Sequence, residues 1–249
     1  MTTALVRRPG PRLAEGLVSH VERQAIDVEL ALRQWHGYVA ALHATGWATV
    51  EVEPADGCPD AVFVEDPVVV HRDVAVLARS GAPVRRAETA GVERAVRAAG
   101  YRVERITAPG TLDGGDVLKV GQTVYVGLSG RTNEAGARQL AGFLDATVVP
   151  VPVTKVLHLK SAVTALPGGT VIGRPPLVDD PALFGDFLAV PEEAGAHVVL
   201  LGGARVLLAA SAPATAALLA ARGLEPVPVD IGEFEKLEGC VTCLSVRLR

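Results

Sequence analysis

Residues 63–106, FVEDPVVVHRDVAVLARSGAPVRRAETAGVERAVRAAGYRVERI, contain the pattern that decides the fold class. Two apolar runs, Phe63–Val70 and Val74–Arg79, flank a short polar turn and predict a pair of strands. A helix is predicted over Pro83–Ala99, opened by its proline and ended by the glycine that follows. Tyr101–Ile106 then alternates as a third strand, so the unit reads strand, turn, strand, helix, strand.

The same unit recurs along the chain. The later copies begin with predicted strands at Asp116–Val120, His158–Leu166 and His197–Leu201 and contain predicted helices at Asn133–Leu144, Pro181–Leu188 and Pro213–Ala221. A fifth copy forms only when the chain ends meet, with Val241–Leu248 paired to Ala4–Arg7, a helix over Val21–Leu42 and a strand over Trp47–Glu53. Five units of roughly 35–50 residues predict a pseudo-symmetric α/β propeller of ββαβ-type repeats, closed by the N- and C-terminal strands. An ordinary open α/β sheet is the alternative, and without a linker or low-complexity tract residues 1–249 read as a single domain.

Composition excludes several classes of protein. The 249 residues are 49% hydrophobic and 21% charged, which is typical of a globular chain and not of a disordered one. The net charge of −4 gives no basic surplus for nucleic-acid binding, and the longest nearly apolar stretch, Val206–Ala221, falls short of a membrane span. Three cysteines and an N-terminus without the apolar core of a signal peptide predict a reducing, cytoplasmic setting.

Polar residues interrupt or precede the first strand of several units, where a propeller would bring them toward its axis. They are Glu65 with Asp66, Asp113 with Asp116, His158, and Cys243. Two adjacent carboxylates in an apolar run are costly to bury unless a cation pairs with them. A thiol, an imidazole, a carboxylate able to orient it and an acidic pair are the parts of cysteine–histidine nucleophilic catalysis on a cationic substrate.

Each of these features also has a structural interpretation. Glu65 and Asp66 can mark a strand end that turns into solvent, TLDGGDVL (111–118) can be an Asx turn, and His158 can be a hydrogen-bonded core histidine. Cys240 and Cys243 form a C-x-x-C pair, which is a weak signal for zinc because no second pair or nearby histidine accompanies it. It is a weak redox signal because a thioredoxin-like motif opens a helix, whereas Val241–Val246 alternates like a strand. A buried, inert cysteine is the remaining interpretation.

Six segments in order resemble the dimethylarginine dimethylaminohydrolases of the guanidino-group-modifying superfamily. They are PDAVFVEDP (59–67), GAPVRR (81–86), TLDGGDVL (111–118), VGLSGRTN (126–133), LHLKS (157–161) and GCVTCLSV (239–246). The resemblance begins at LVRRP (5–9) and covers nearly the whole chain. It implies a five-bladed α/β propeller that hydrolyses Nω,Nω-dimethylarginine, or Nω-monomethylarginine, to citrulline and an alkylamine. It also implies a covalent S-alkylthiouronium intermediate on cysteine and neither a metal nor an organic cofactor.

The resemblance implies roles for individual residues. Cys243 would be the nucleophile, His158 the general acid and base, and Asp113 the carboxylate that orients His158. The implied substrate-binding residues are Glu65 and Asp66 for the guanidinium, Asp60 for the α-amino group, Arg85 and Arg131 for the α-carboxylate, and Leu17 in a segment like the mobile lid. Cys240 matches no catalytic position.

Arginine deiminases resemble the chain in the Gly-Gly-Asp and cysteine motifs and give the main alternative activity. Their histidine is typically followed two residues later by an aspartate, where this chain has Lys160, and they are much longer. Two further alternatives are a non-catalytic propeller that binds a protein or ribosomal surface and a redox protein that uses the C-x-x-C pair. The expected partner is a small methylated arginine, without nucleic acid or membrane, and the sequence is compatible with a homodimer.

Overall fold

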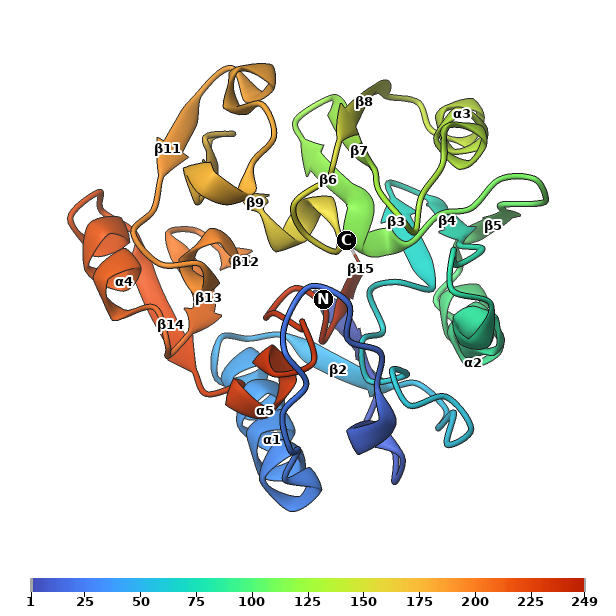
Figure 1. The fold of residues 1–249 in the computed structure, drawn as a ribbon, viewed down its shortest axis with the longest axis horizontal. Coiled ribbons are helices and arrows are strands. Elements are labelled where there is room, and N and C mark those ends of the chain that lie inside the picture. Colours follow the sequence, from blue (N-terminus) through green and yellow to red (C-terminus); the bar gives the residue numbers. More distant parts are fainter. Residues whose placement is uncertain (1, 249) are drawn as a thin grey trace.

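Five three-stranded sheets surround a central axis, with most of the helices on the outside (Figure 1). The computed structural model describes residues 2–248. The strands, sheet by sheet, are β15 (Val246–Leu248), β1 (Thr3–Val6) and β2 (Ala48–Glu51); β3 (Val68–His71), β4 (Val74–Leu77) and β5 (Arg102–Arg105); β6 (Val117–Val120), β7 (Thr123–Leu128) and β8 (Thr147–Pro152); β9 (Val163–Ala165), β10 (Val171–Gly173) and β11 (Phe187–Ala189); β12 (Val199–Gly202), β13 (Arg205–Ala209) and β14 (Glu225–Val229). The five-bladed α/β propeller is confirmed, and the open-sheet alternative is wrong.

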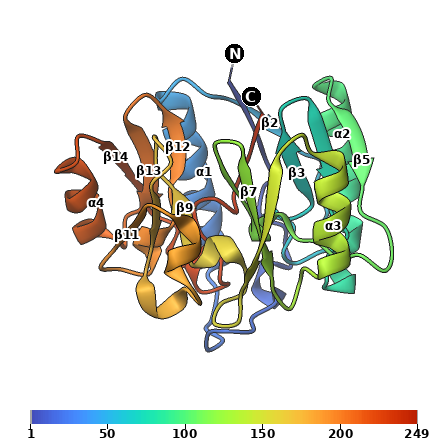
Figure 2. The same cartoon turned by 90° about the horizontal axis from the view of Figure 1, so that it is seen from above.

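Every sheet has the same strand directions. The first strand runs antiparallel to the second, and the third runs parallel to the second. A parallel neighbour needs a crossover, which is helical in four blades and consists of α1 (Val28–Ala44), α2 (Thr89–Ala98), α3 (Glu134–Phe143) and α4 (Pro213–Ala220). The two chain ends share one sheet, since Leu5 of β1 pairs with Val246 of β15. Seen from above, the helices flank the sheets and the chain ends lie at one side of the molecule (Figure 2).

Three predicted helices differ in the structure. In the helix predicted over Pro83–Ala99, Pro83–Glu88 form a 3₁₀ segment, and α2 begins at Thr89. The helix predicted from Val21 begins at Val28, because the Asp27 carboxylate accepts the N–H of Leu30 and caps it there. The helix predicted over Pro181–Leu188 is wrong: Pro181–Phe184 form a 3₁₀ turn, and the chain then enters β11. In the blade formed by β9, β10 and β11, the crossover therefore consists of 3₁₀ turns in place of an α-helix.

The core is divided between the blades. Trp35, Tyr38 and Leu42 on one face of α1 are buried against Ala4 and Val6 of β1, and four further clusters fill the other blade interfaces. The short helix α5 (Gly232–Glu235) packs against α1 and leads into the turn that precedes β15. No helix among residues 2–248 combines the length and apolarity needed to cross a membrane.

Candidate active site

The chemically interesting residues lie in turns, one step before the inner strands. Asp66 is in a turn that precedes β3, Asp113 precedes a 3₁₀ turn before β6, and His158 precedes another before β9. Cys243 lies in a turn before β15, so the strand predicted from Val241 begins only at Val246. Turns release these side chains from the alternation of a strand and let them converge near the axis.

Most of the predicted site residues line one small cavity. Its walls are Leu17, Asp60, Phe63, Asp66, Arg85, Arg131, Leu157, His158, Leu237, Glu238, Gly239 and Cys243. The cavity has a volume of about 20 Å³, which is room for roughly one water molecule. Asp113 is fully buried behind His158, whereas Glu65 lies outside this cavity. The cavity thus joins the predicted nucleophile and acid–base histidine to most of the predicted substrate-binding residues.

His158 is buried among carboxylates. Its Nε2 lies 3.2 Å from Asp113 Oδ2, and its Nδ1 lies 3.9 Å from Asp66 Oδ1. Burial alone would lower the pKa of His158, but Asp66, Asp116 and Asp113 outweigh it and raise that pKa to about 9. The imidazole is therefore charged at neutral pH and carries a proton that it can donate.

The DGGD segment explains how the histidine is held. The backbone N–H of Gly115 donates to Asp66 Oδ1 at 3.0 Å, and a Cβ at Gly115 would come within 2.6 Å of His158 Nδ1. Glycine is therefore required for this close approach. Asp116 accepts the N–H of Leu159 at 2.9 Å, which fixes the residue that follows His158. The sequence singled out Asp116 but gave no sign of this anchoring role.

Asp66 shares an arginine with a carboxylate that the sequence analysis missed. Arg85 Nη1 donates to Asp66 Oδ2 at 2.5 Å, and its Nε and Nη2 donate to both oxygens of Glu88. Burial opposes ionisation of Asp66, but the charges of His158 and Arg85 outweigh it and lower the pKa of Asp66 to about 2. The available signal for Glu88 was its position three residues after Arg85, in the segment that Pro83 opens.

Asp60 and Arg131 complete the polar wall. The Asp60 carboxylate accepts the N–H of Leu17 at 3.0 Å, which ties the segment around Leu17 to the cavity. Burial raises the pKa of Asp60, although Arg85 and the Leu17 N–H act in the opposite direction. Arg131 Nη1 lies 3.4 Å from Asp113 Oδ2, so it approaches the same carboxylate as His158.

The predicted nucleophile has a second thiol beside it. Cys243 Sγ lies 3.4 Å from Cys240 Sγ, and both cysteines are free and buried. The hydrogen bond with Cys240 and burial raise the pKa of Cys243, and the charges of Glu65 and Asp66 add to this effect. The same hydrogen bond lowers the pKa of Cys240. The raised pKa keeps Cys243 protonated at neutral pH, so that thiol needs activation.

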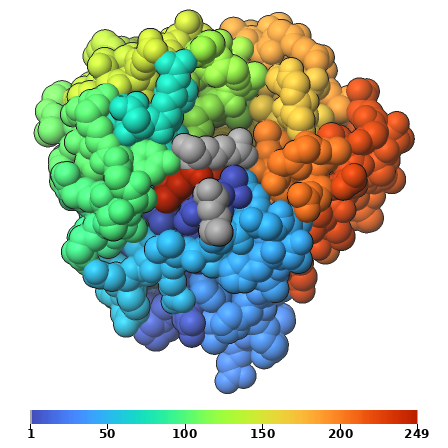
Figure 3. Space-filling view, turned by 180° about the vertical axis from the view of Figure 1, so that it is seen from behind, coloured from blue at the N-terminus to red at the C-terminus, as the bar shows by residue number. Residues whose placement is uncertain are grey.

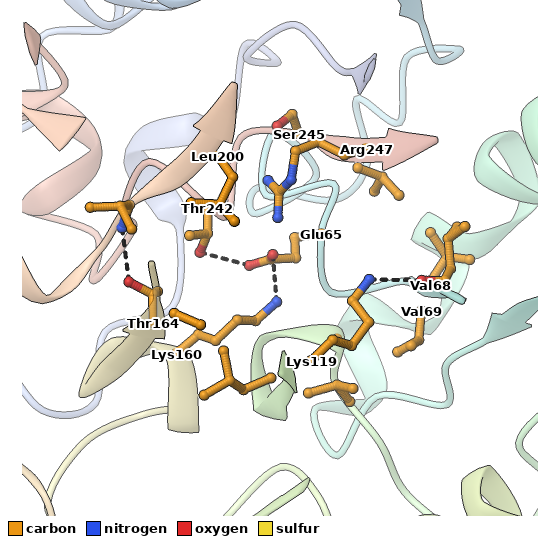
Figure 4. A pocket seen from close by; sticks show the side chains of 17 residues that line it. Glu65, Val68, Val69, Lys119, Lys160, Thr164, Leu200, Thr242, Ser245 and Arg247 are labelled. Carbon is orange, nitrogen blue, oxygen red and sulfur yellow. Dashed lines mark hydrogen bonds and ion pairs between the residues drawn. The ribbon is translucent and has the colours of Figure 1, made fainter. Parts of the chain in front are cut away.

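Glu65 faces a different cavity, which it lines together with Lys160 and Thr242 (Figure 4). Its Oε1 accepts from Lys160 Nζ at 2.5 Å and its Oε2 accepts from the Thr242 hydroxyl at 2.9 Å. This cavity has a volume of about 170 Å³ and lies among the inner strands. Viewed from behind, the molecule is hollowed around its axis, with C-terminal residues exposed at depth (Figure 3). The structure therefore does not bring the side chain of Glu65 to Cys243 and His158.

One group of side chains in residues 2–248 has the donor atoms for a metal ion. Asp66, Asp113 and His158 each offer an atom, and these atoms lie within 4.8 Å of one another. Two of these groups already have protein partners. Nε2 of His158 is hydrogen-bonded to Asp113, and Asp66 accepts a hydrogen bond from Arg85. The group is arranged as an imidazolium between carboxylates, which fits proton transfer, and the absence of a cofactor stays a prediction.

A propeller of five such blades is the pentein fold, and comparison with known proteins identifies the family within it. The family model described as N,N dimethylarginine dimethylhydrolase, eukaryotic, matches residues 18–164. The N(G),N(G)-dimethylarginine dimethylaminohydrolase of Streptomyces coelicolor is 71% identical over 249 residues, covering 99% of this chain and 96% of the relative. The chain therefore belongs to the dimethylarginine dimethylaminohydrolase family.

Solved structures agree with this assignment along the whole chain. A dimethylarginine dimethylaminohydrolase variant captured as an adduct with S-methyl-L-thiocitrulline has a TM-score of 0.93 and 33% identity, and covers 99% of both chains. A variant of the Pseudomonas aeruginosa enzyme in complex with citrulline has a TM-score of 0.92 and 34% identity, and covers 99% of this chain and 98% of the other. Both relatives thus carry, in their crystals, a citrulline or a thiocitrulline derivative.

Proposed function

We propose that this chain hydrolyses Nω,Nω-dimethyl-L-arginine, and Nω-monomethyl-L-arginine, to citrulline and the corresponding alkylamine, within a single catalytic domain. The observation that carries the proposal is the cavity that joins Cys243 to the charged His158 and to the Asp66 carboxylate. Membership of the family and the citrulline complex of the Pseudomonas aeruginosa relative support the substrate class. A reducing, cytoplasmic setting belongs to the same proposal, supported by three free cysteines.

Binding begins at Asp66. A guanidinium with a pKa above about 12 stays charged and presents N–H donors in a fork, and a carboxylate has about four lone-pair sites. Asp66 uses one oxygen for Gly115 and the other for Arg85, so sites remain for the substrate N–H groups. Asp60 would take the α-amino group, and Arg85 with Arg131 the α-carboxylate. This arrangement holds the guanidinium carbon in front of Cys243.

Substrate entry requires movement of the segment that covers the cavity. The cavity has room for about one water molecule, and an arginine side chain is far larger. Leu17 forms one wall, and the backbone N–H groups of Ser19 and His20 donate to the Glu238 carboxylate at 2.8 and 2.6 Å. Glu238 therefore fastens the covering segment, which must lift from it when substrate enters.

The bound cation activates the thiol. Its positive charge offsets the field of Asp66 and lowers the pKa of Cys243, whose thiolate then attacks the guanidinium carbon. His158 donates its proton to the departing dialkylamine as the C–N bond breaks, which leaves an S-alkylthiouronium on Cys243. His158 next takes a proton from water, and the resulting hydroxide attacks the same carbon. Breaking of the C–S bond then releases citrulline and regenerates the thiol.

The same geometry favours methylated substrates over arginine. Each methyl group replaces an N–H donor, and a carboxylate left facing it costs about 1–3 kcal/mol. The side chain of Glu65 hydrogen-bonds to Lys160 in the other cavity. It therefore does not face the guanidinium beside Asp66. A site with Asp66 on one side of the guanidinium can accept methyl groups on the other.

An assay with four substrates tests the proposal. Citrulline and amine release are measured from dimethylarginine, monomethylarginine, arginine and agmatine side by side with one enzyme preparation. The two methylated arginines should turn over at least about tenfold more efficiently than arginine. Faster release of ammonia from arginine would identify a short arginine deiminase, and turnover of none of them would favour the non-catalytic propeller.

A further inference from the structure

The two cysteines of the C-x-x-C segment are positioned to react with each other. Cys240 and Cys243 lie in one turn, in which the N–H of Cys243 donates to the carbonyl of Cys240 at 3.0 Å. Their sulfur atoms are 3.4 Å apart, and a disulfide needs about 2 Å. Closing the remaining distance of roughly 1 Å needs rotation of the side chains within one turn and no movement between blades.

The pair also has the surroundings that thiol oxidation needs. Cys243 lines the active-site cavity, where a molecule slightly larger than water can reach it when the covering segment moves. The hydrogen bond between the two sulfurs lowers the pKa of Cys240, and a thiolate is the form that attacks an oxidant. Cys58 is a natural comparison, because its sulfur contacts the backbone carbonyl of Val84 and no other sulfur within residues 2–248.

The geometry points to a reversible Cys240–Cys243 disulfide that switches the nucleophile off when a hydroperoxide reaches the active site. One thiolate attacks the terminal peroxide oxygen, the O–O bond breaks, and the sulfur becomes a sulfenic acid while alkoxide leaves, or hydroxide when the oxidant is hydrogen peroxide. The other thiolate attacks that sulfur, the S–O bond breaks, and hydroxide leaves. The two protons of the thiols neutralise the two leaving anions, so two thiols and one hydroperoxide give one disulfide, water and an alcohol, or two waters from hydrogen peroxide.

The disulfide would protect Cys243 as well as silence it. A lone catalytic thiolate oxidises beyond the sulfenic acid to acids that thiol reductants do not reverse. Cys240, with its sulfur 3.4 Å away, captures the sulfenic acid first. The active enzyme is then restored by any dithiol that reduces the disulfide.

The test compares the wild-type chain with Cys240→Ser and Cys58→Ser. Each protein is treated with hydrogen peroxide, its remaining thiols are blocked under denaturing conditions, and its mass and peptides are measured with and without dithiothreitol. In wild type and Cys58→Ser, Cys240 and Cys243 should together lose two hydrogen atoms, and dithiothreitol should restore both thiols. In Cys240→Ser that product should be absent, and Cys243 should instead gain oxygen atoms.

Activity gives the second readout, which rests on the proposed function. Peroxide should lower citrulline formation by wild type at least about tenfold, with recovery by dithiothreitol, whereas the treated Cys240→Ser variant should stay largely inactive. The disulfide proposal is overturned if Cys243 of the wild type gains oxygen atoms and no disulfide to Cys240 is detected, or if both thiols remain unmodified. The mass measurement needs no turnover. It would therefore still show whether the disulfide forms if the chain lacked the proposed activity.

Discussion

The same three turns line two different cavities. Each turn places one side chain toward the active-site cavity and a near neighbour toward the cavity among the inner strands. The pairs are Asp66 and Glu65, His158 and Lys160, and Cys243 and Thr242. Side chains that are close in the sequence therefore face different cavities and have different environments.

The difference between the cavities lies in how their charges are balanced. Glu65 is satisfied within the protein, because Lys160 and Thr242 occupy both of its oxygens. Around His158, by contrast, three carboxylates surround one imidazole, and lone pairs of Asp66 remain for a ligand. Glu65 is thus neutralised within the protein, in a cavity that Lys119 and Arg247 also line, whereas the carboxylates around His158 keep acceptor sites for a cationic substrate.

The largest expected effect separates the two thiols. Cys243→Ser should lower citrulline formation by more than about 10³-fold, because a hydroxyl without a strong base is a far weaker nucleophile. Cys240→Ser should retain most of the activity, because its sulfur lies beside the nucleophile and outside the cavity wall. Steady-state kinetics of both variants check this. Equal losses would show that the two thiols act as one unit and would favour the redox alternative.

The next effect concerns His158 and the origin of the thiolate. His158→Gly should slow turnover by about 10²–10⁴-fold, the usual value of a general acid and base. A chloroacetamidine probe bearing the cationic amidine should still alkylate Cys243 in this variant, because the bound cation activates the thiol. Labelling is followed by intact mass at several probe concentrations. Complete loss of labelling would mean that His158 itself generates the thiolate.

A smaller effect divides the adjacent acids. Asp66→Asn should lower kcat/KM about 10- to 100-fold, because the guanidinium loses a charge-assisted hydrogen bond. Glu65→Gln should change kcat/KM by less than about tenfold but lower the free energy of unfolding by about 3 kcal/mol, because it leaves Lys160 buried without a counter-charge.

Kinetics and urea unfolding of the two variants, measured side by side, test this division. A Glu65→Gln variant with wild-type stability and a large kinetic defect would place Glu65 at the substrate after all.

The sequence predicted the blades because each one repeats local signals. Paired apolar runs joined by turns are short-range features that the structure retains in all five sheets, and an α-helix follows them in four of the blades. The start of α1 was different, because the apolar periodicity continues upstream to Val21. Asp27 caps the helix, and its own N–H donates to Glu233, more than 200 positions away in the chain. Such long-range contacts are invisible to periodicity.

The candidate site shows the same limit. The motifs singled out Glu65 and Asp66 together, but a turn decides which carboxylate faces the cavity, and turn geometry is not a pattern of residue types. In the sequence, Lys160 mattered only because arginine deiminases have an aspartate at this position. In the structure, Lys160 forms an ion pair with Glu65. Glu88 carried no motif at all, although it binds Arg85 through two hydrogen bonds.

The last expected effect is a dependence of stability on pH, which reports the charge of His158 in the active-site cavity. The pKa of His158 is raised from 6.5 to about 9 in the folded chain, so protonation of His158 favours the folded state. This contribution is fully present below about pH 6.5 and is lost as the pH rises through about 9, with a size on the order of 3 kcal/mol. A His158→Gln variant lacks this contribution. The stability advantage of wild type over the variant should therefore shrink as the pH rises from about 6.5 to about 9.

Urea unfolding at pH 6, 7.5 and 9, with a reductant to keep Cys240 and Cys243 as thiols, measures that difference. Turnover should fall over the same alkaline range, because a neutral imidazole has no proton for the departing amine, although the bound cation shifts the midpoint downward. A stability difference independent of pH would mean that His158 is neutral in the folded chain. The proton for the amine would then have to come from another group.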